Sequence, residues 1–410
     1  MSGVKCRFCD TPLSLSFVDL GAAPLSNSYL RAEDLDKMEP FYALHAFVCQ
    51  VCRLVQVVHT VSPQELFREY AYFSSYSESW LRHAGNYADQ MTHRLGLDEQ
   101  SLVVEVASND GYLLKYFKEK GIRVLGLEPA HNVAHVAQRA GIQTIEEFFG
   151  LKTATELSND GKKADLLIGN NVLAHVPDLN DFVQGLKILL RSWGTITMEF
   201  PHLLRLMLGN QFDTIYHEHF SYFSFMSVEK IFASHGLTVF DVEEIPTHGG
   251  SLRVYVGHTE ERKGHSSERV SALRERELEA GLAGDAAYSD FGLQVQRTKR
   301  KLLDVLIDIK DRNKSIVGYG APAKGNILLN YCGIRTDFLA YTVDRNPYKQ
   351  GLFTAGTRIP ICRPEKILET KPDYVLILPW NLKDEIMDQM RHVRDWDGKF
   401  IVPIPEVEIL

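Results

Sequence analysis

The chain has 410 residues, of which 45% are hydrophobic and 24% are charged. This balance is typical of globular proteins and excludes a disordered or fibrous chain. The length indicates two or three domains, because one hydrophobic core rarely serves so many residues. The net charge of −8 argues against a protein whose main partner is nucleic acid.

The sequence also predicts the cellular compartment of the protein. It has no run of 18 or more apolar residues, so no membrane-spanning helix is expected. The first residues lack the pattern of a secretory signal, and six cysteines are too few for a disulfide scaffold in a chain of this length. We therefore expect a cytoplasmic protein with reduced thiols and no membrane contact, and its well-mixed acidic composition is compatible with a monomer.

Two CxxC pairs, Cys6/Cys9 and Cys49/Cys52, mark the N-terminal region. Four thiolates complete a tetrahedral shell around zinc and leave no open position for a substrate. The metal would therefore stabilise a small domain over residues 1–65 rather than take part in a reaction. The alternative, four buried or redox-active cysteines, is weaker because redox CxxC motifs do not usually occur in pairs.

An aromatic and serine-rich run follows at residues 70–80. It places six hydroxyls between Tyr72 and Ser79, which is unusual for a buried surface, where each hydroxyl needs a partner. A lining for a polar ligand and core packing both stay open for this run. A helix through His83 and Met91 is expected after it.

Short apolar runs alternate with helical patterns from residue 100 onward, which predicts an α/β fold with a parallel, doubly wound, Rossmann-like sheet. The ligand of such a sheet lies at the carboxyl ends of its strands. The predicted strands of this central domain, residues 66–262, are 102–107, 122–127, 142–145, 164–169 and 194–200. A further strand is predicted at 252–256.

A polar helical linker is predicted at residues 263–312, and the strand–helix pattern then returns. Residues 313–410 are predicted to form a second Rossmann-like unit. Its predicted strands are 315–319, 338–343, 374–378 and 399–402.

The turn after the strand at 102–107, Glu105-Val-Ala-Ser-Asn-Asp-Gly111, is the first candidate binding site. It has a single glycine, so the glycine fingerprint of dinucleotide sites is weak. Glu128 lies seventeen residues after Gly111, at the tip of the next strand, where a carboxylate accepts both hydroxyls of a ribose. The acidic Glu105 and Asp110 disfavour a pyrophosphate, so S-adenosylmethionine is favoured over NAD.

Residues 213–222, DTIYHEHFSY, follow the fifth strand on the ligand side of the sheet. A helical metalloprotease site needs histidines four residues apart, whereas these lie two apart. We interpret the segment as acid–base machinery, since imidazole titrates near neutrality. Asn170, Asn171 and His175 follow the fourth strand, and functional and structural interpretations of that histidine stay equally open.

Three later segments can bind an anion or a sugar. Residues 246–253, PTHGGSLR, can hold an anion or simply turn the chain. Residues 318–326, GYGAPAKGN, open a helix after a strand, so backbone N–H groups and Lys324 can meet a phosphate. Residues 344–349 follow the next strand. A degenerate nucleotide-binding unit and an interdomain scaffold are the alternatives for this region.

Ten motifs spread over nearly the whole chain carry a resemblance to a known family. They are CxxC…CxxC, EYAYFSSYSESW, EVASNDGYLL, GLEPAHNVA, NNVLAHVPDLNDF, MEFPHLL, FDTIYHEHFSYFS, THGGSLRVYV, GYGAPAKGN and VDRNPYKQG. The chain resembles the S-adenosylmethionine-dependent sugar C-methyltransferases of deoxysugar biosynthesis. These strings are long and ordered, so they are more specific than any single glycine motif.

The resemblance implies a zinc-bearing N-terminal lobe, a central S-adenosylmethionine domain and a C-terminal Rossmann-like lobe that closes over a nucleotide-diphosphate sugar. The implied catalytic residues are His219, Tyr216, Glu218, His175 and Tyr70. The expected cofactor contacts are Tyr72, Ser75, Glu105, Ala107, Ser108, Asn109, Gly111, Glu128, Pro129, Asn170 and Asn171. The expected substrate contacts are Tyr76, Ser251, Arg253, Tyr319, Lys324, Asn326, Asp344, Arg345, Asn346 and Lys349.

A sugar carbon becomes nucleophilic only when a neighbouring ketone acidifies its C–H bond. We expect His219 to remove the proton from C3, with Tyr216 and His175 near the C4 oxygen and Glu218 orienting or polarising His219. The expected substrate is a 4-keto-6-deoxysugar, with thymidine diphosphate the favoured carrier. The alternatives are a zinc-containing RNA methyltransferase, which needs a basic surface, and a nucleotide-sugar oxidoreductase that uses the C-terminal unit.

Overall fold

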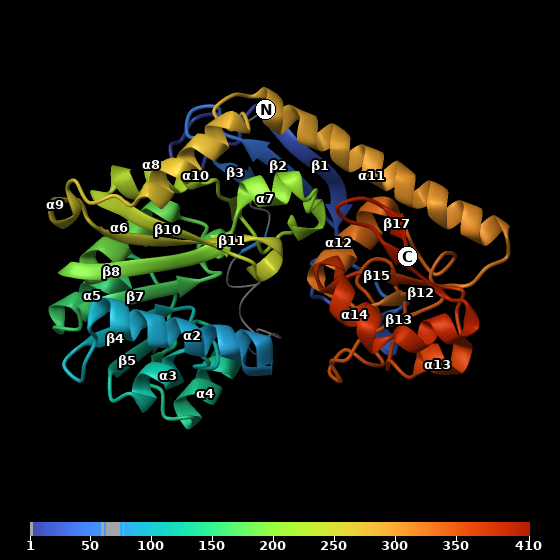
Figure 1. Cartoon of the computed structure of the whole chain (residues 1–410), viewed down its shortest axis with the longest axis horizontal. Helices are drawn as coiled ribbons and strands as arrows, with labels where there is room; N and C mark the ends of the chain where they lie inside the picture. Colours follow the sequence, from blue (N-terminus) through green and yellow to red (C-terminus); the bar gives the residue numbers. More distant parts are fainter. Residues whose placement is uncertain (1–2, 59–60, 63–73, 77) are drawn as a thin grey trace.

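The structure is a computed structural model that describes residues 3–58, 61–62, 74–76 and 78–410. Strands in these residues form sheets of four, seven and six strands. Two α/β units lie side by side, and the N-terminal strands and the long helix α11 run along one edge of both (Figure 1). Tyr70 and Tyr72 lie outside the described residues, as does the side chain of Tyr76.

The central sheet has the strand order β10-β11-β8-β7-β4-β5-β6. The five strands from β4 to β8 are parallel, as predicted, but β11 runs antiparallel to both β8 and β10. β10 is a strand that the sequence analysis does not predict. The strands are β4 (Leu102–Val106), β5 (Arg123–Leu127), β6 (Thr144–Ile145), β7 (Ala164–Asn170), β8 (Leu190–Pro201), β10 (Leu237–Ile245) and β11 (Ser251–His258).

Helices cover both faces of this sheet, because successive side chains of a buried strand point to opposite faces. Val103 packs in one core with α2, α3 and α4, whereas Val104 packs in another with α5, α6 and α8. The helices are α2 (Glu78–Leu95), α3 (Leu114–Glu119), α4 (His131–Arg139), α5 (Leu151–Asn159), α6 (Leu179–Leu189), α7 (Leu203–Leu208), α8 (Phe225–Ser234) and α9 (Thr259–Arg262).

The N-terminal sheet is antiparallel and includes a strand from far along the chain. Its order is β1-β2-β3-β9, and Val55 and Gln56 of β3 pair with Tyr222 and Ser221 of β9. The segment that carries the predicted catalytic residues therefore ends as an edge strand of the zinc lobe. The strands are β1 (Leu15–Ala23), β2 (Tyr42–Val48), β3 (Val55–Val57) and β9 (Ser221–Tyr222).

The predicted linker is helical. α10 (Glu268–Glu279) is followed by the 26-residue α11 (Ala286–Asp311), which lies along β1 and reaches the C-terminal unit (Figure 1). The rings of Phe17 in β1 and Phe291 in α11 stack with centroids 4.5 Å apart. One hydrophobic cluster joins β1, β2 and α11 to the C-terminal sheet, so the N-terminal strands and the C-terminal unit share a core.

The C-terminal unit is a second, mostly parallel sheet with the order β14-β13-β12-β15-β16-β17, in which only β17 is antiparallel to its neighbour. Its strands are β12 (Ile316–Tyr319), β13 (Thr342–Val343), β14 (Ile361–Cys362), β15 (Tyr374–Ile377), β16 (Lys399–Val402) and β17 (Glu408–Ile409). Its helices are α12 (Ala323–Cys332), α13 (Lys366–Thr370) and α14 (Lys383–Gln389).

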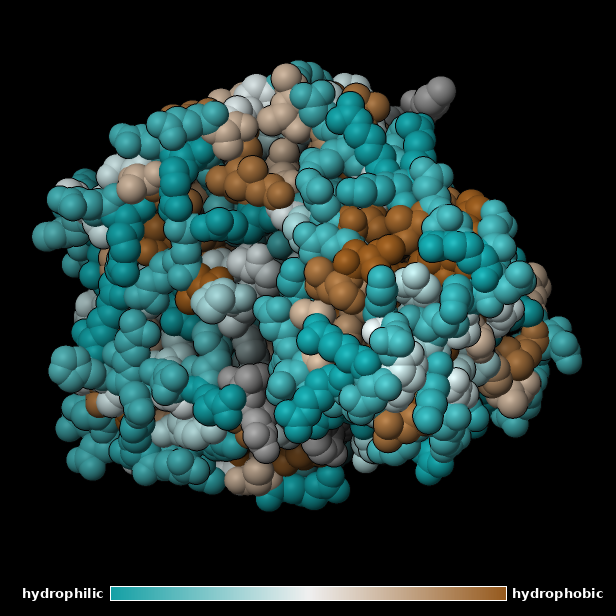
Figure 2. Space-filling model, turned by 45° about the vertical axis from the view of Figure 1, so that its right-hand side comes forward, coloured by the Kyte–Doolittle hydropathy of each residue, from teal (hydrophilic) through white to brown (hydrophobic). Residues whose placement is uncertain are grey.

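Short 3-10 turns carry several of the predicted site residues. They are η1 (Ala32–Asp34), η2 (Ser74–Tyr76), η3 (Leu173–His175), η4 (Phe212–Thr214), η5 (Thr247–Gly249), η6 (Trp380–Leu382) and η7 (Arg391–Trp396). None of the helices in the described part of the chain has the length and hydropathy to cross a bilayer. Hydrophilic residues cover most of the face in Figure 2.

Candidate active site

The four N-terminal cysteines converge, although 39 residues separate Cys9 from Cys49. Cys49 and Cys52 lie in the turn between β2 and β3. Cys6 Sγ lies 3.5 Å from Cys52 Sγ, and Cys9 Sγ lies 3.4 Å from Cys49 Sγ. All four sulfurs are within 4.8 Å of one another. Thiolates about 2.3 Å from zinc stand at such separations in a tetrahedral shell, so the cluster provides a structural zinc site.

The β4–α3 turn is shaped to approach a ligand with its backbone. Ala107, Asn109 and Gly111 all have positive φ angles, of 56°, 51° and 79°, a conformation that residues other than glycine rarely adopt. The Glu105 carboxyl is buried at the end of β4, where burial raises its pKa and the side chain of Tyr112 opposes this shift. A buried carboxylate favours a cationic partner, and S-adenosylmethionine carries an ammonium and a sulfonium.

Glu128 lies beside this turn, at the end of β5. Its two carboxylate oxygens each accept one backbone N–H, from Asn109 and from Ala130, at 2.9 Å. Burial raises the pKa of the Glu128 carboxyl. Each oxygen keeps a lone pair for a ribose hydroxyl. Pro129, Asn170 and Asn171 lie at the same edge, because β5, β4 and β7 are neighbours in the sheet.

Two of the predicted cofactor contacts, Ser108 and Ser75, lie against other parts of the protein. Ser108 is fully buried and packs so closely on β5 that a Cβ at Gly126 would lie 2.4 Å from its Oγ. Ser75, in η2, donates to Asp110 Oδ2 at 2.6 Å and thereby joins the aromatic run to the cofactor turn. The structure thus turns both serines toward protein groups, which a motif alone does not reveal.

His219 has a defined tautomer. Its Nδ1 lies 3.1 Å from the carbonyl oxygen of Thr214, which can only accept, so Nδ1 carries the hydrogen and Nε2 carries the lone pair. The Tyr216 hydroxyl lies 2.9 Å from that Nε2. Burial, followed by the nearby His175, holds the pKa of His219 well below its ordinary value of 6.5. The imidazole is therefore neutral at neutral pH, with an unprotonated Nε2.

His175 comes from η3, just after β7, and its ring centroid lies 4.8 Å from that of His219. The backbone N–H of Phe220 donates to the carbonyl of Ala174 at 2.7 Å and fixes the two segments together. Burial lowers the pKa of His175 to about 4. The structure therefore brings together three of the predicted catalytic residues, His175, Tyr216 and His219.

His217 and Glu218, which lie between Tyr216 and His219 in the sequence, contact the N-terminal lobe instead. His217 Nε2 lies 3.2 Å from the carbonyls of Tyr42 and Ala43 in β2, which anchors the segment to the zinc lobe. The Glu218 carboxylate accepts from Asn27 Nδ2 at 2.7 Å, and burial raises its pKa. Glu218 was expected to orient His219, but both ring nitrogens of His219 are held by Thr214 and Tyr216, so the carbonyl of Thr214 has that role.

Ser251 and Arg253, expected at the substrate, are committed to the protein. Ser251 Oγ donates to the carbonyl of Thr247 at 3.0 Å. The Arg253 guanidinium is only 4% exposed and donates to Glu199 at 2.9 Å and to Glu243 at 3.4 Å. A buried cation needs such carboxylates, so Arg253 joins β8, β10 and β11, and the contact of these two residues with the substrate stays a prediction.

The C-terminal unit contacts the base of the catalytic segment through Asp213, which the sequence analysis did not single out. The Trp380 indole N–H donates to Asp213 Oδ2 at 2.8 Å, and the carboxyl group is fully buried. Burial raises its pKa to about 6, and the ammonium of Lys324 opposes this shift. Lys324 lies over the Trp380 ring, 4.4 Å from its centroid, and donates to Asn381.

Three of the six other predicted substrate residues in this unit hold the N-terminal segment 26–30 and the β12–α12 turn. Asn326 Nδ2 donates to the carbonyl of Ser26 at 2.5 Å, and Asp344 accepts the backbone N–H of Ala321 at 2.8 Å. Lys349 Nζ donates to the carbonyl of Ala321 at 2.9 Å.

The remaining three residues of that group differ in exposure. Tyr319 is buried and donates to Gln389 at 3.3 Å. Asn346 contacts Asp344 through its backbone N–H, at 2.8 Å. Arg345 is exposed, so it is a cation of this unit that a ligand can reach.

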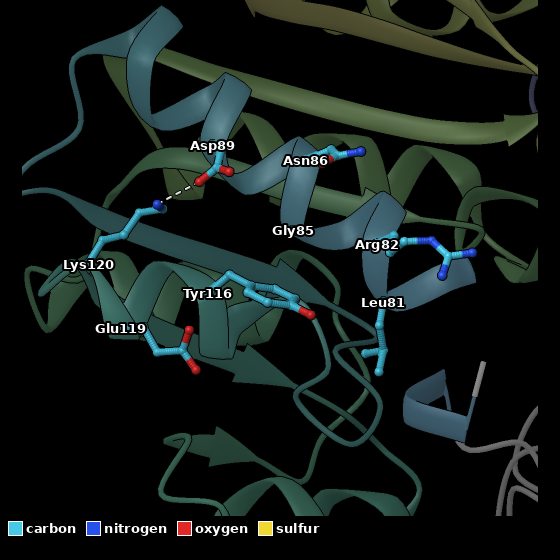
Figure 3. Close-up of a pocket in the computed structure, with 8 residues that line it drawn as sticks. All are labelled: Leu81, Arg82, Gly85, Asn86, Asp89, Tyr116, Glu119 and Lys120. Atoms are coloured by element: carbon cyan, nitrogen blue, oxygen red, sulfur yellow. Dashed lines mark ion pairs between the residues drawn. The ribbon is translucent and has the colours of Figure 1, made fainter. Parts of the chain in front are cut away.

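A shallow pocket of about 450 Å³ lies between α2 and α3 (Figure 3). Lys120 and Asp89, which both line it, form an ion pair of 2.6 Å, and the ring of Tyr116 lies between the two helices. None of the predicted site residues lines it. The pocket lies on the helical layer, whereas the residues described above gather at the carboxyl ends of the strands.

Comparison with known proteins places this geometry in a family. The chain is 36% identical over 407 residues to the C-methyltransferase NovU of Streptomyces niveus, and the match covers 99% of this chain and 96% of that protein. The chain belongs to the S-adenosylmethionine-dependent C-methyltransferases. Three family models agree, described as a zinc binding domain over residues 6–67, a methyltransferase domain over 80–242 and a C-methyltransferase C-terminal domain over 246–405.

Solved structures resemble this C-methyltransferase over part of its length. The 1,6-didemethyltoxoflavin-N1-methyltransferase of Burkholderia thailandensis is 19% identical, with a TM-score of 0.36, and covers 50% of this chain and 96% of its own. The magnesium protoporphyrin IX methyltransferase of Synechocystis is 13% identical, with a TM-score of 0.36, and covers 47% of this chain and 92% of its own.

Proposed function

We propose that this C-methyltransferase methylates C3 of a nucleotide-linked 4-keto-6-deoxysugar, with thymidine diphosphate as the favoured carrier, through an enolate. The observation that carries the proposal is the neutral His219, whose Nε2 lone pair is set by the Thr214 carbonyl and faces Tyr216. Carbon methylation needs a base for a C–H proton, and a proton next to a ketone is acidic enough for imidazole to remove.

In the proposed reaction, His219 Nε2 takes the C3 proton. The Tyr216 hydroxyl turns from Nε2 toward the C4 oxygen, where it stabilises the developing enolate together with His175. S-adenosylmethionine, when bound at Glu105 and Glu128, supplies an electrophilic methyl group. The chain holds the sugar carbon in line and excludes water, which converts an encounter of two ligands into an oriented reaction.

We assign the sugar to the space between the central domain, residues 66–262, and the C-terminal unit, residues 313–410. The zinc lobe, residues 1–65, contacts the segment that carries His219 at two points. Its strand β3 pairs with β9, and Asn27 donates to Glu218. Arg345 is the exposed cation that we assign to the diphosphate. The β12–α12 turn itself is bonded to Tyr29 and Lys349, which favours a scaffold over an open dinucleotide site.

The direct test is incubation with S-adenosylmethionine and a panel of thymidine-, guanosine- and cytidine-diphosphate 4-keto-6-deoxysugars, with the mass of the product as readout. We expect the mass gain of one methyl group on a thymidine-linked sugar, and loss of deuterium when C3 is deuterated. Methylation at oxygen, or retention of the C3 deuterium in a methylated product, would contradict the enolate route.

The pH dependence of the reaction should reflect the lowered pKa of His219. The base works in its deprotonated form, and a depressed pKa keeps it deprotonated in more acidic solution. Activity is therefore present above the folded-state pKa and lost as the pH falls through it. We expect the acidic limb of kcat/KM, which reports the free enzyme, to lie below pH 6.5. A limb at or above 6.5 would mean that another group titrates.

Replacing Trp380 with phenylalanine should weaken catalysis from a distance. The change removes the N–H that Asp213 accepts, next to the Thr214 carbonyl that holds His219, and leaves a smaller ring beneath Lys324. A hydrogen bond to a charged acceptor contributes about 1.5–3 kcal/mol, so we expect kcat to fall by roughly 10-fold. The KM for S-adenosylmethionine should not change, because the contacts of the indole are with Asp213 and Lys324, whereas the expected cofactor contacts follow β4, β5 and β7.

Asp213→Asn is the matched variant, because its amide oxygen still accepts from the indole. We expect it to keep most of the activity that Asp213→Ala loses. Equal losses of activity in Asp213→Asn and Asp213→Ala would assign the effect to the charge of Asp213 rather than to the hydrogen bond. An unchanged kcat in Trp380→Phe would refute the link between Trp380 and His219.

A further inference from the structure

Two histidines stand one turn apart on the exposed side of α4, opposite a carboxylate that follows β6. The Nε2 atoms of His131 and His135 lie 3.0 Å apart, with the rings nearly perpendicular at 84°. His131 Nδ1 lies 2.7 Å from Glu146 Oε2. Gln138 Nε2 donates to the other oxygen of Glu146 at 3.1 Å and holds the carboxylate in place.

These contacts define which nitrogen of His131 has a lone pair for a metal. A carboxylate oxygen accepts hydrogen bonds, and Glu146 Oε2 lies 2.7 Å from His131 Nδ1. Nδ1 of His131 therefore carries the hydrogen. Its Nε2 lone pair accepts from the Nε2–H of His135 at 3.0 Å. When the hydrogen of His135 resides on Nδ1 instead, both Nε2 atoms present lone pairs to a metal.

The arrangement matches the requirements of a transition-metal site. Two imidazole nitrogens bound to zinc at about 2.0–2.1 Å are separated by roughly 3.3 Å in a tetrahedral shell, close to the 3.0 Å between these Nε2 atoms. A carboxylate on the far nitrogen of a metal-bound imidazole is the usual outer partner of such ligands. Donor atoms of all three residues lie within 4.8 Å of one another.

We propose that His131 and His135 form a second metal site, distinct from the cysteine cluster, that binds a divalent transition metal such as zinc, nickel or copper, with Glu146 as the group that orients His131. Nitrogen ligands select these ions over magnesium and calcium, which prefer oxygen. The side chains are exposed, so water completes the coordination. The metal would join two successive turns of α4, and the hydrogen bond between His131 and Glu146 connects them to the chain after β6.

The site borders the cofactor edge of the sheet. α4 begins directly after Ala130, whose backbone N–H donates to Glu128. β6 pairs with β5, the strand that ends in Glu128. A metal held by His131 and His135 would therefore sit on the outside of the turn that carries Glu128, away from His219.

Metal stoichiometry tests the proposal on the full chain with its structural zinc in place. After equilibrium dialysis against a series of free Zn²⁺ concentrations, bound zinc per chain is measured by plasma mass spectrometry. We expect the wild-type protein to take up one more equivalent than His135→Ala. Glu146→Gln should weaken that uptake by about 10-fold or more, as the loss of outer partners does in other sites.

His93→Ala is the control, because it removes another exposed histidine, from the last turn of α2, and should keep the additional equivalent. Alanine suits an exposed helix position, so both variants should melt at the same temperature without added zinc. With zinc, only the chains that bind it should gain stability. Equal uptake by wild type and His135→Ala, or displacement of the additional zinc by an equal concentration of Mg²⁺, would overturn the proposal.

Discussion

Replacing His219 with asparagine should abolish methyl transfer and leave the affinity for S-adenosylmethionine unchanged. Asparagine retains an N–H that can donate to the Thr214 carbonyl, but it has no basic nitrogen in place of Nε2. Positioned bases contribute about 10²–10⁴-fold to rates, so kcat should fall by at least about 100-fold. The measurements are product formation by mass spectrometry, cofactor binding by calorimetry and deuterium exchange at C3 of the sugar.

The neighbouring His217 provides the matched control. Its Nε2 faces the carbonyls of Tyr42 and Ala43, and glutamine at this position can present an amide N–H to the same oxygens. We expect His217→Gln to keep kcat within a few-fold of wild type. If His219→Asn loses cofactor binding, or if C3 still exchanges deuterium at the wild-type rate, His219 is not the base.

Replacing Cys49 with serine should remove the zinc and unfold the N-terminal lobe. Structural zinc in small domains contributes about 10–16 kcal/mol of binding free energy that is also folding free energy. The lobe pairs with β9 two residues after His219, so activity should fall with the metal. Zinc content, thermal unfolding and methyl transfer can be measured on the same preparation.

Cys362→Ser is the corresponding control, because Cys362 lies in β14, outside the zinc cluster. That variant should retain one structural zinc per chain and the wild-type melting temperature. A Cys49→Ser protein with full zinc content, or one that loses zinc without any change in melting temperature, would show that the four thiolates do not hold a stabilising metal.

The alternation of apolar runs and helical patterns was enough to predict the central sheet. β4, β5, β7 and β8 are buried on both faces, and such strands are continuous runs of apolar residues that a sequence displays directly. β10 was missed because its pattern, LTVFDVEEI, mixes acidic residues into an edge strand. Its acidic Glu243 accepts from Arg253 of β11, a partner that only the hairpin brings close.

Part of the candidate site could also be predicted, because its residues follow strands that the sequence displays. The carboxyl ends of neighbouring parallel strands meet at one edge, so Glu105, Glu128 and Asn170 could be assigned to a common site before the structure was known. The roles of individual side chains could not be assigned. Ser108 and Arg253 look available in a motif, yet close packing on Gly126 determines where Ser108 points, and the carboxylates of Glu199 and Glu243 determine where Arg253 points.

The sequence by itself determined the class of fold, the zinc ligands, the cofactor edge and the segment that holds His219, because these depend on local periodicity and spacing. Only the tertiary structure decided the partners of that segment. Asn27 meets Glu218 across 191 residues, and Asp213 meets Trp380 across 167. Such contacts arise from the packing of three separate parts of the chain, and short-range patterns contain no information on which distant side chain will be adjacent.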